Sequence, residues 1–119
     1  YDEFLGIKVP NNSLGVLQDV HWSMGAFGYF PTYTLGNLYS AQLLSAAKKD
    51  LGDINKQIKQ GEFFPLLEWM REKIHSRGSI IEPAELIKEA TGHFPSSEEF
   101  IGYLKDKISD LYEIDISLT

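Results

Sequence analysis

The chain has 119 residues, of which 17 are acidic and 11 basic, so its formal net charge at pH 7 is −6. The lysines and arginines are scattered along the chain, which argues against a nucleic-acid partner. With no cysteine, a disulfide framework, a thiolate zinc cluster and a thiol nucleophile are all excluded. The sequence has neither a signal-peptide pattern nor an apolar run of about 18 residues, so we expect a cytoplasmic protein with no membrane partner.

Apolar periodicity predicts an all-α chain of about five short helices. Apolar residues recur at spacings of three and four after Pro31 and again after Ser96, as on the buried face of a helix. The predicted helices span, in chain order, residues 31–50, 54–60, 63–74, 83–91 and 96–112. Ahead of them, residues 1–14 are interpreted as the tail of a helix that Gly6 ends, followed by a turn-rich loop, and residues 79–81 as a brief extended link. Ser96 and Glu99 have the spacing of a capping box.

The segment 15–34 differs from the rest because it combines aromatic residues, glycines and polar groups. Gln18 and Asp19 lie just before His21 and Trp22. Polar side chains at this density either tie down a buried loop or orient a reacting group. Composition alone favours the buried loop and leaves both interpretations open.

Tyr33 is a second candidate. Phe30 precedes Pro31 and is therefore pushed toward an extended conformation, which places Tyr33 in the first turn of the following helix. There a phenol lies near free backbone N–H groups and can donate to a developing negative charge. Packing in the core is the alternative for a single tyrosine, and Tyr29, four residues earlier, is expected on the same face.

The histidines do not predict a metal site within the chain. His21, His75 and His93 lie in different segments, without the pairing at i, i+4 that puts two ligands on one helix face. His75 is interpreted as a solvent-exposed group that interacts with the C-terminal end of a helix dipole. His93 is expected in a loop. A triad of Asp19, His21 and Ser23 is disfavoured because catalytic triads are assembled from separate segments.

Residues 15–22 carry a family resemblance. They match the pattern G-x-x-Q-D-x-H-W at every fixed position, and residues 28–37 are similar to the block that follows it in the thermostable (Taq-type) zinc carboxypeptidases. Members of that family are several times longer, largely helical, and remove the C-terminal residue from peptides. Their zinc-binding H-E-x-x-H helix is absent here. The resemblance implies that residues 1–119 are a single C-terminal helical fragment, about a quarter of a zincin-like peptidase, with 15–37 as an active-site wall and 38–119 as scaffold.

The resemblance also implies roles for individual residues. His21 and Tyr33 would be catalytic, donating hydrogen bonds to the peptide substrate and to the tetrahedral oxyanion. Tyr29 would contact substrate, Gln18 and Asp19 would position His21, and Trp22 would form the wall behind it. Zinc or cobalt would be bound in the full-length enzyme, with no metal ligand from this chain, so the isolated fragment is expected to be inactive. A homodimer is compatible with the resemblance.

The alternative is a stand-alone acidic helical domain for protein interaction. Such a domain would dock a partner through an exposed aromatic surface. The residues of that surface would be Phe27, Tyr29, Phe30, Phe63 and Phe64. An H-E-x-x-H motif upstream would support the enzyme, whereas an initiator Met directly before Tyr1 would support the interaction domain.

Overall fold

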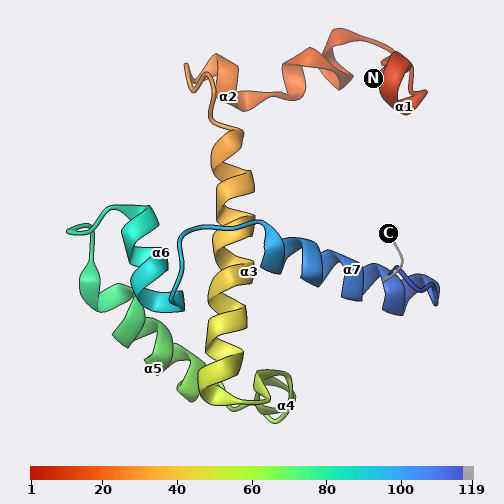
Figure 1. Ribbon diagram of the computed structural model, residues 1–119. Coiled ribbons are helices and arrows are strands. Elements are labelled where there is room, and N and C mark those ends of the chain that lie inside the picture. Colours follow the sequence, from red (N-terminus) through yellow and green to blue (C-terminus); the bar gives the residue numbers. More distant parts are fainter. Residues whose placement is uncertain (117–119) are drawn as a thin grey trace. The chain divides into compact units, whose positions relative to one another are not determined.

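The computed structural model describes residues 1–116, and within them it confirms the all-α class. This part of the chain holds seven α-helices and three short 3-10 helices, with no strand (Figure 1). The expected number of about five helices was too low, because two four-residue helices near the N-terminus were missed or only partly anticipated. Contacts along the chain divide it into two compact units, Tyr1–Tyr33 and the chain from Thr34 onward, which are described separately.

The first unit consists of very short helices joined by turns. They are α1 (Asp2–Leu5), η1 (Asn12–Leu14), η2 (Val16–Gln18) and α2 (Val20–Ser23), where η denotes a 3-10 helix. Gly6 ends α1 with φ of 65°, in the left-handed region that favours glycine. The first unit contains no buried side chain, and large apolar residues such as Met24 and Phe27 are more than two-thirds exposed, at 77% and 71%.

The helices from Pro31 onward lie close to their predicted positions. They are α3 (Pro31–Leu51), α4 (Ile54–Lys59), α5 (Phe64–Lys73), η3 (His75–Arg77), α6 (Pro83–Thr91) and α7 (Glu98–Tyr112). Proline occupies one of the first two helical positions in α5 and α6, where its missing N–H costs nothing. Residues 79–81 form a turn and bends, so the extended link was wrong. α3 has 21 residues and is not short.

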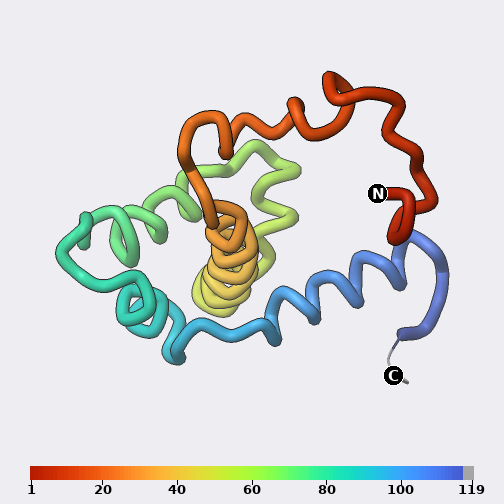
Figure 2. The backbone as a smooth tube through the Cα atoms, turned by 90° about the horizontal axis from the view of Figure 1, so that it is seen from above, coloured from red at the N-terminus to blue at the C-terminus, as the bar shows by residue number. Residues whose placement is uncertain are grey.

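In the second unit, α5 and α6 lie on one side of α3, and α7 leads away on the other side (Figures 1 and 2). Figure 2 looks along α3. The core joins Ala46 and Ala47 of α3 to Ile54 of α4 and Trp69 of α5. The Trp69 indole N–H donates to the Asp50 carboxylate at 2.8 Å, which satisfies the polar edge of a buried ring.

Gln42 ties the segment between α6 and α7 to α3. Its side chain is buried, at 1% exposure. Its Oε1 accepts from the backbone N–H of Ser96 at 3.1 Å, while its Nε2 donates to Thr91 Oγ1 at 2.8 Å and lies 3.0 Å from His93 Nδ1. Because a backbone N–H can only donate, the contact with Ser96 fixes which way the amide faces. The start of α7 is therefore held by a residue 54 positions earlier in the chain.

The predicted capping box is only half formed. Ser96 Oγ accepts from the backbone N–H of Glu98 at 3.1 Å, as a capping hydroxyl does. The Glu99 carboxylate does not return to Ser96 but pairs with His93 Nε2 at 3.0 Å. The predicted hydrogen bond from the Ser96 N–H to Glu99 was wrong, because this N–H donates to Gln42 Oε1 instead. The Glu99 carboxylate is therefore available to pair with His93.

Replacing Ser96 with alanine is expected to lower the free energy of unfolding by about 1 kcal/mol, because the Glu98 N–H loses its acceptor. Urea denaturation followed by circular dichroism measures the difference. Ser97→Ala is the matched control, since Ser97 is the N-cap residue of α7 but its side chain makes no capping hydrogen bond. Equal losses in the two variants would contradict the capping role of Ser96.

Candidate active-site wall

Asp19 contacts His21 at two points, its backbone N–H and its ring. As the N-cap of α2, its Oδ1 accepts from the backbone N–H of His21 at 2.8 Å. The same oxygen lies 3.1 Å from His21 Nδ1. The His21 and Asp19 side chains are 24% and 28% exposed. Solvent can therefore reach the pair, although the two contacts hold it in place. One carboxylate thus sets both the start of the helix and the orientation of the imidazole ring.

The far edge of the imidazole contacts Tyr33. His21 Nε2 lies 2.9 Å from the Tyr33 hydroxyl. Tyr33 lies in the first turn of α3, as predicted, and its backbone N–H donates to the carbonyl of Phe30 at 3.1 Å. The phenol is 53% exposed. The structure therefore joins the two catalytic candidates, 12 residues apart in the sequence, into one hydrogen-bonded pair within the first unit.

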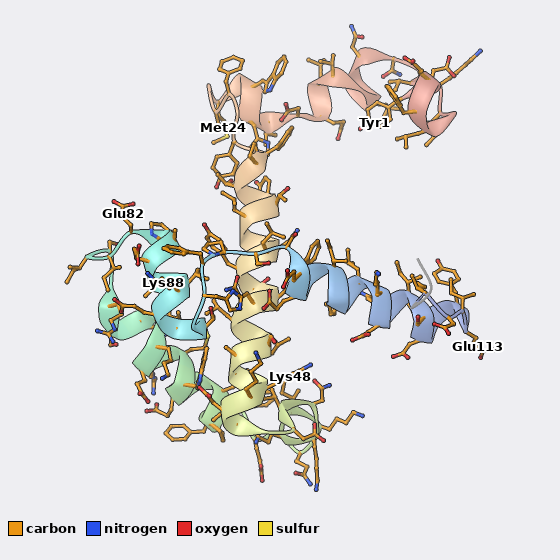
Figure 3. The ribbon with its side chains drawn as sticks, viewed as in Figure 1. Tyr1, Met24, Lys48, Glu82, Lys88 and Glu113 are labelled. Atoms are coloured by element: carbon orange, nitrogen blue, oxygen red, sulfur yellow. The ribbon has the colours of Figure 1, made fainter. Side chains whose placement is uncertain are left out.

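Aromatic rings surround the imidazole. Tyr29 stacks on His21 with ring centroids 5.4 Å apart and planes at 23°, and Phe30 meets it edge-on at 5.0 Å. Tyr29 also packs against Tyr33 at 5.3 Å, so these two tyrosines share a face as expected. Figure 3 shows several ring side chains near the labelled Met24, where α2 leads into α3. Phe30 was expected only as part of an exposed aromatic surface, and its contact with the His21 ring was not anticipated.

Gln18 and Trp22 contact other partners. The Gln18 amide donates to the backbone carbonyl of Ser13, which ties η2 to η1. Trp22 packs against Phe27, with ring centroids 5.6 Å apart. Both side chains nevertheless border the same cavity as His21. That cavity, of about 710 Å³, lies within the first unit and is lined by Tyr1, Val9, Asn12, Gly15, Val16, Gln18, Asp19, Val20, His21, Trp22 and Phe30.

The described residues do not offer a metal centre. Within residues 1–116, no group of three or more histidine, aspartate or glutamate side chains is placed to hold an ion. His75 begins η3, and His93 is engaged with Gln42 and Glu99. The part of the chain that the structure describes also contains no helix long and apolar enough to cross a membrane.

Comparison with known proteins identifies the class of this chain. The family model described as "Carboxypeptidase Taq (M32) metallopeptidase" matches residues 1–108. The chain is 46% identical over 112 residues to thermostable carboxypeptidase 1 of Thermus thermophilus, and 43% identical over 112 residues to carboxypeptidase 1 of Bacillus subtilis. The chain therefore belongs to the M32 carboxypeptidase family, and the predicted resemblance is confirmed.

Solved structures agree with this assignment. The crystal structure of an M32 carboxypeptidase from Deinococcus radiodurans superposes with a TM-score of 0.86 at 36% identity, covering 96% of this chain and 23% of that one. A Pyrococcus furiosus carboxypeptidase gives a TM-score of 0.80 at 47% identity, covering 89% of this chain and 21% of that one. Each of the two curated relatives is matched over 94% of this chain, which spans 22% of their own length.

Proposed function

We propose that this chain is the C-terminal part of a metallocarboxypeptidase and supplies one wall of its catalytic cleft. The observation that carries the proposal is the exposed contact between His21 Nε2 and the Tyr33 hydroxyl, at 2.9 Å, in a chain that belongs to a family of carboxypeptidases. An imidazole and a phenol that lie together at an accessible position can both donate hydrogen bonds to the carbonyl oxygen of a peptide.

The pair would act on the oxygen of the scissile carbonyl. When water adds to that carbonyl carbon, negative charge develops on the oxygen, and donors placed beforehand stabilise it more than they stabilise the substrate. Tyr33 is well placed for this because it stands in the first turn of a 21-residue helix, where the helix dipole favours negative charge. His21 and Tyr33 are therefore assigned the catalytic hydrogen bonds to substrate and oxyanion.

The neighbouring residues would position or border this pair. Asp19 orients His21 through the contact at 3.1 Å. Tyr29, which is 47% exposed and stacked on the imidazole, is assigned a contact with the peptide substrate. Gln18 would act on His21 only indirectly, by fixing the turn before Asp19, and Trp22 would form part of the cavity wall beside the ring.

The family description implies a metal ion, and the described residues of this chain do not fit one. His21 is committed to Asp19 and Tyr33, and His93 to Gln42 and Glu99, so these two rings already have partners. We therefore assign the ligands of the zinc or cobalt ion to another part of the full-length enzyme.

The exposed apolar side chains support a role within a larger protein. Phe27, Phe30, Phe63 and Phe64 are each more than half exposed, which fits a surface that other polypeptide covers. The interaction-domain hypothesis predicts the same exposure. The family match over residues 1–108 favours the enzyme, because it includes the segment that holds His21 and Tyr33.

Peptide hydrolysis tests the proposal. A complete polypeptide containing this chain is expected to release the C-terminal amino acid from an N-blocked dipeptide, and to leave the corresponding C-terminal amide intact. The isolated 119-residue chain is expected to release none above the buffer rate, with and without added zinc. Metal-dependent release by the isolated chain would contradict the proposal, because it would require ligands that we assign elsewhere.

A further inference from the structure

The cavity beside His21 has largely apolar walls. Its volume is about 710 Å³, and all the residues that line it belong to the first unit. Six of the eleven lining residues carry aliphatic or aromatic side chains, namely Tyr1, Val9, Val16, Val20, Trp22 and Phe30. Sites that bind small molecules commonly have this size and combine apolar walls with a few polar groups.

The cavity adjoins the proposed catalytic pair. His21 lines it, and the Nε2 atom of the same ring lies 2.9 Å from the Tyr33 hydroxyl. Phe30 also lines it and meets the imidazole edge-on, with ring centroids 5.0 Å apart. A peptide whose scissile carbonyl is bound by the pair has one side chain on each side of that carbonyl, on Cα atoms about 3.8 Å apart. A side chain of the substrate is then within reach of the cavity.

Contacts within the first unit hold the wall around Val16 in place. A Cβ atom on Gly15 would lie 2.5 Å from Val9 Cγ1, so the glycine allows Val9 to approach η2 more closely than another residue would. The Gln18 amide donates to the Ser13 carbonyl and ties η2 to η1. A wall that is formed before a ligand arrives loses less conformational entropy on binding.

We infer that this cavity receives an apolar side chain of the peptide substrate, and that Val16 is a specificity-determining residue for the size of that side chain. The inference rests on the proposed function. Val16 is 67% exposed and therefore accessible to substrate, whereas the polar groups of Asp19 and His21 bind each other. An aliphatic or aromatic side chain gains free energy by leaving water for such walls, and a charged side chain loses its hydration.

The selectivity of the complete enzyme among substrates tests the inference. Two series of N-blocked dipeptides are compared, one with alanine, leucine or phenylalanine at the C-terminal position and one with the same residues at the penultimate position. In one series, kcat/KM should be higher for leucine than for alanine. Val16→Phe is expected to lower this ratio about tenfold or more, because its ring fills part of the cavity and a misfit of one methylene already costs about that much. The series that responds identifies the side chain that the cavity takes.

Leu17→Phe is the matched control. Leu17 follows Val16 in η2 and is 68% exposed, but it is not among the described residues that line the cavity. The ratio for leucine over alanine should therefore stay unchanged in this variant. Val16→Ala widens the cavity and should instead raise kcat/KM for phenylalanine relative to leucine, which supplies a second reading should Val16→Phe not fold.

The outcomes separate the inference from the proposed function. Ratios equal to those of the unmodified enzyme in both Val16 variants and both series would overturn the inference, even if Tm falls, because a merely structural side chain changes stability and not selectivity. The proposed function would still stand in that case. If the complete enzyme releases no amino acid from any of the dipeptides, the proposed function fails, and the inference fails with it.

Discussion

Gln42→Leu is expected to lower the free energy of unfolding by about 2–4 kcal/mol, because leucine fills a similar volume but makes none of the hydrogen bonds of the amide. Gln42 is 1% exposed and meets the backbone N–H of Ser96, the Thr91 hydroxyl and His93 Nδ1. Each partly buried group left without a partner costs about 1–3 kcal/mol. Urea denaturation followed by circular dichroism measures the loss.

Two further variants isolate the hydrogen bonds of Gln42 from its packing. Gln42→Glu keeps an acceptor for the Ser96 N–H but cannot donate to Thr91 or His93, so it should also destabilise the chain. Gln60→Leu changes an exposed glutamine and should alter stability by less than about 0.5 kcal/mol. A Gln42→Leu variant as stable as Gln60→Leu would show that the segment between α6 and α7 does not depend on this amide.

Tyr33→Phe is expected to lower kcat of the complete enzyme by about 10²–10³-fold, the usual cost of removing one donor to a developing oxyanion. The substitution removes only the hydroxyl that lies 2.9 Å from His21 Nε2. KM should change much less, because the lost interaction strengthens in the transition state. Steady-state kinetics on an N-blocked dipeptide measures both constants.

The same measurement on His21→Gln and on the double variant tests whether the pair acts as a unit. Residues that act together give losses that are far from additive, so the double variant should be little worse than either single one. Tyr112→Phe is the control, since this tyrosine is 71% exposed at the end of α7, and its kcat should be unchanged. Unchanged kcat in Tyr33→Phe would remove Tyr33 from the catalytic assignment.

Local sequence signals predicted the helices well. Pro31, Pro65 and Pro83 stand at or next to the starts of α3, α5 and α6, and Gly92 ends α6 in the left-handed conformation. These signals depend on each residue's own backbone preferences, which act within one or two turns. The four-residue α2 was missed because so short a helix has no apolar period, although Asp19 is a good N-cap residue.

The site was anticipated less evenly. The motif at residues 15–22 and the similar block at residues 28–37 carried the family resemblance, which the comparisons confirm. The roles of His21, Tyr33, Tyr29, Gln18, Asp19 and Trp22 stay predictions. Gln18 was expected, together with Asp19, to position His21, and its amide donates to the Ser13 carbonyl. A side-chain amide can reach several backbone groups, and the sequence alone does not show which of them becomes its hydrogen-bond partner.

By itself, the sequence determined the all-α class, the helix positions after Pro31 and the family, because turn residues, apolar spacing and a dense motif are local properties of the chain. Only the tertiary structure showed that Gln42 bonds Ser96 and that Glu99 turns to His93 instead of completing a capping box. Both results depend on Gln42, which packing brings together with hydrogen-bonding groups 49 to 54 positions later in the chain. The competition among partners for a buried hydrogen bond is settled by packing rather than by the preference of any single residue.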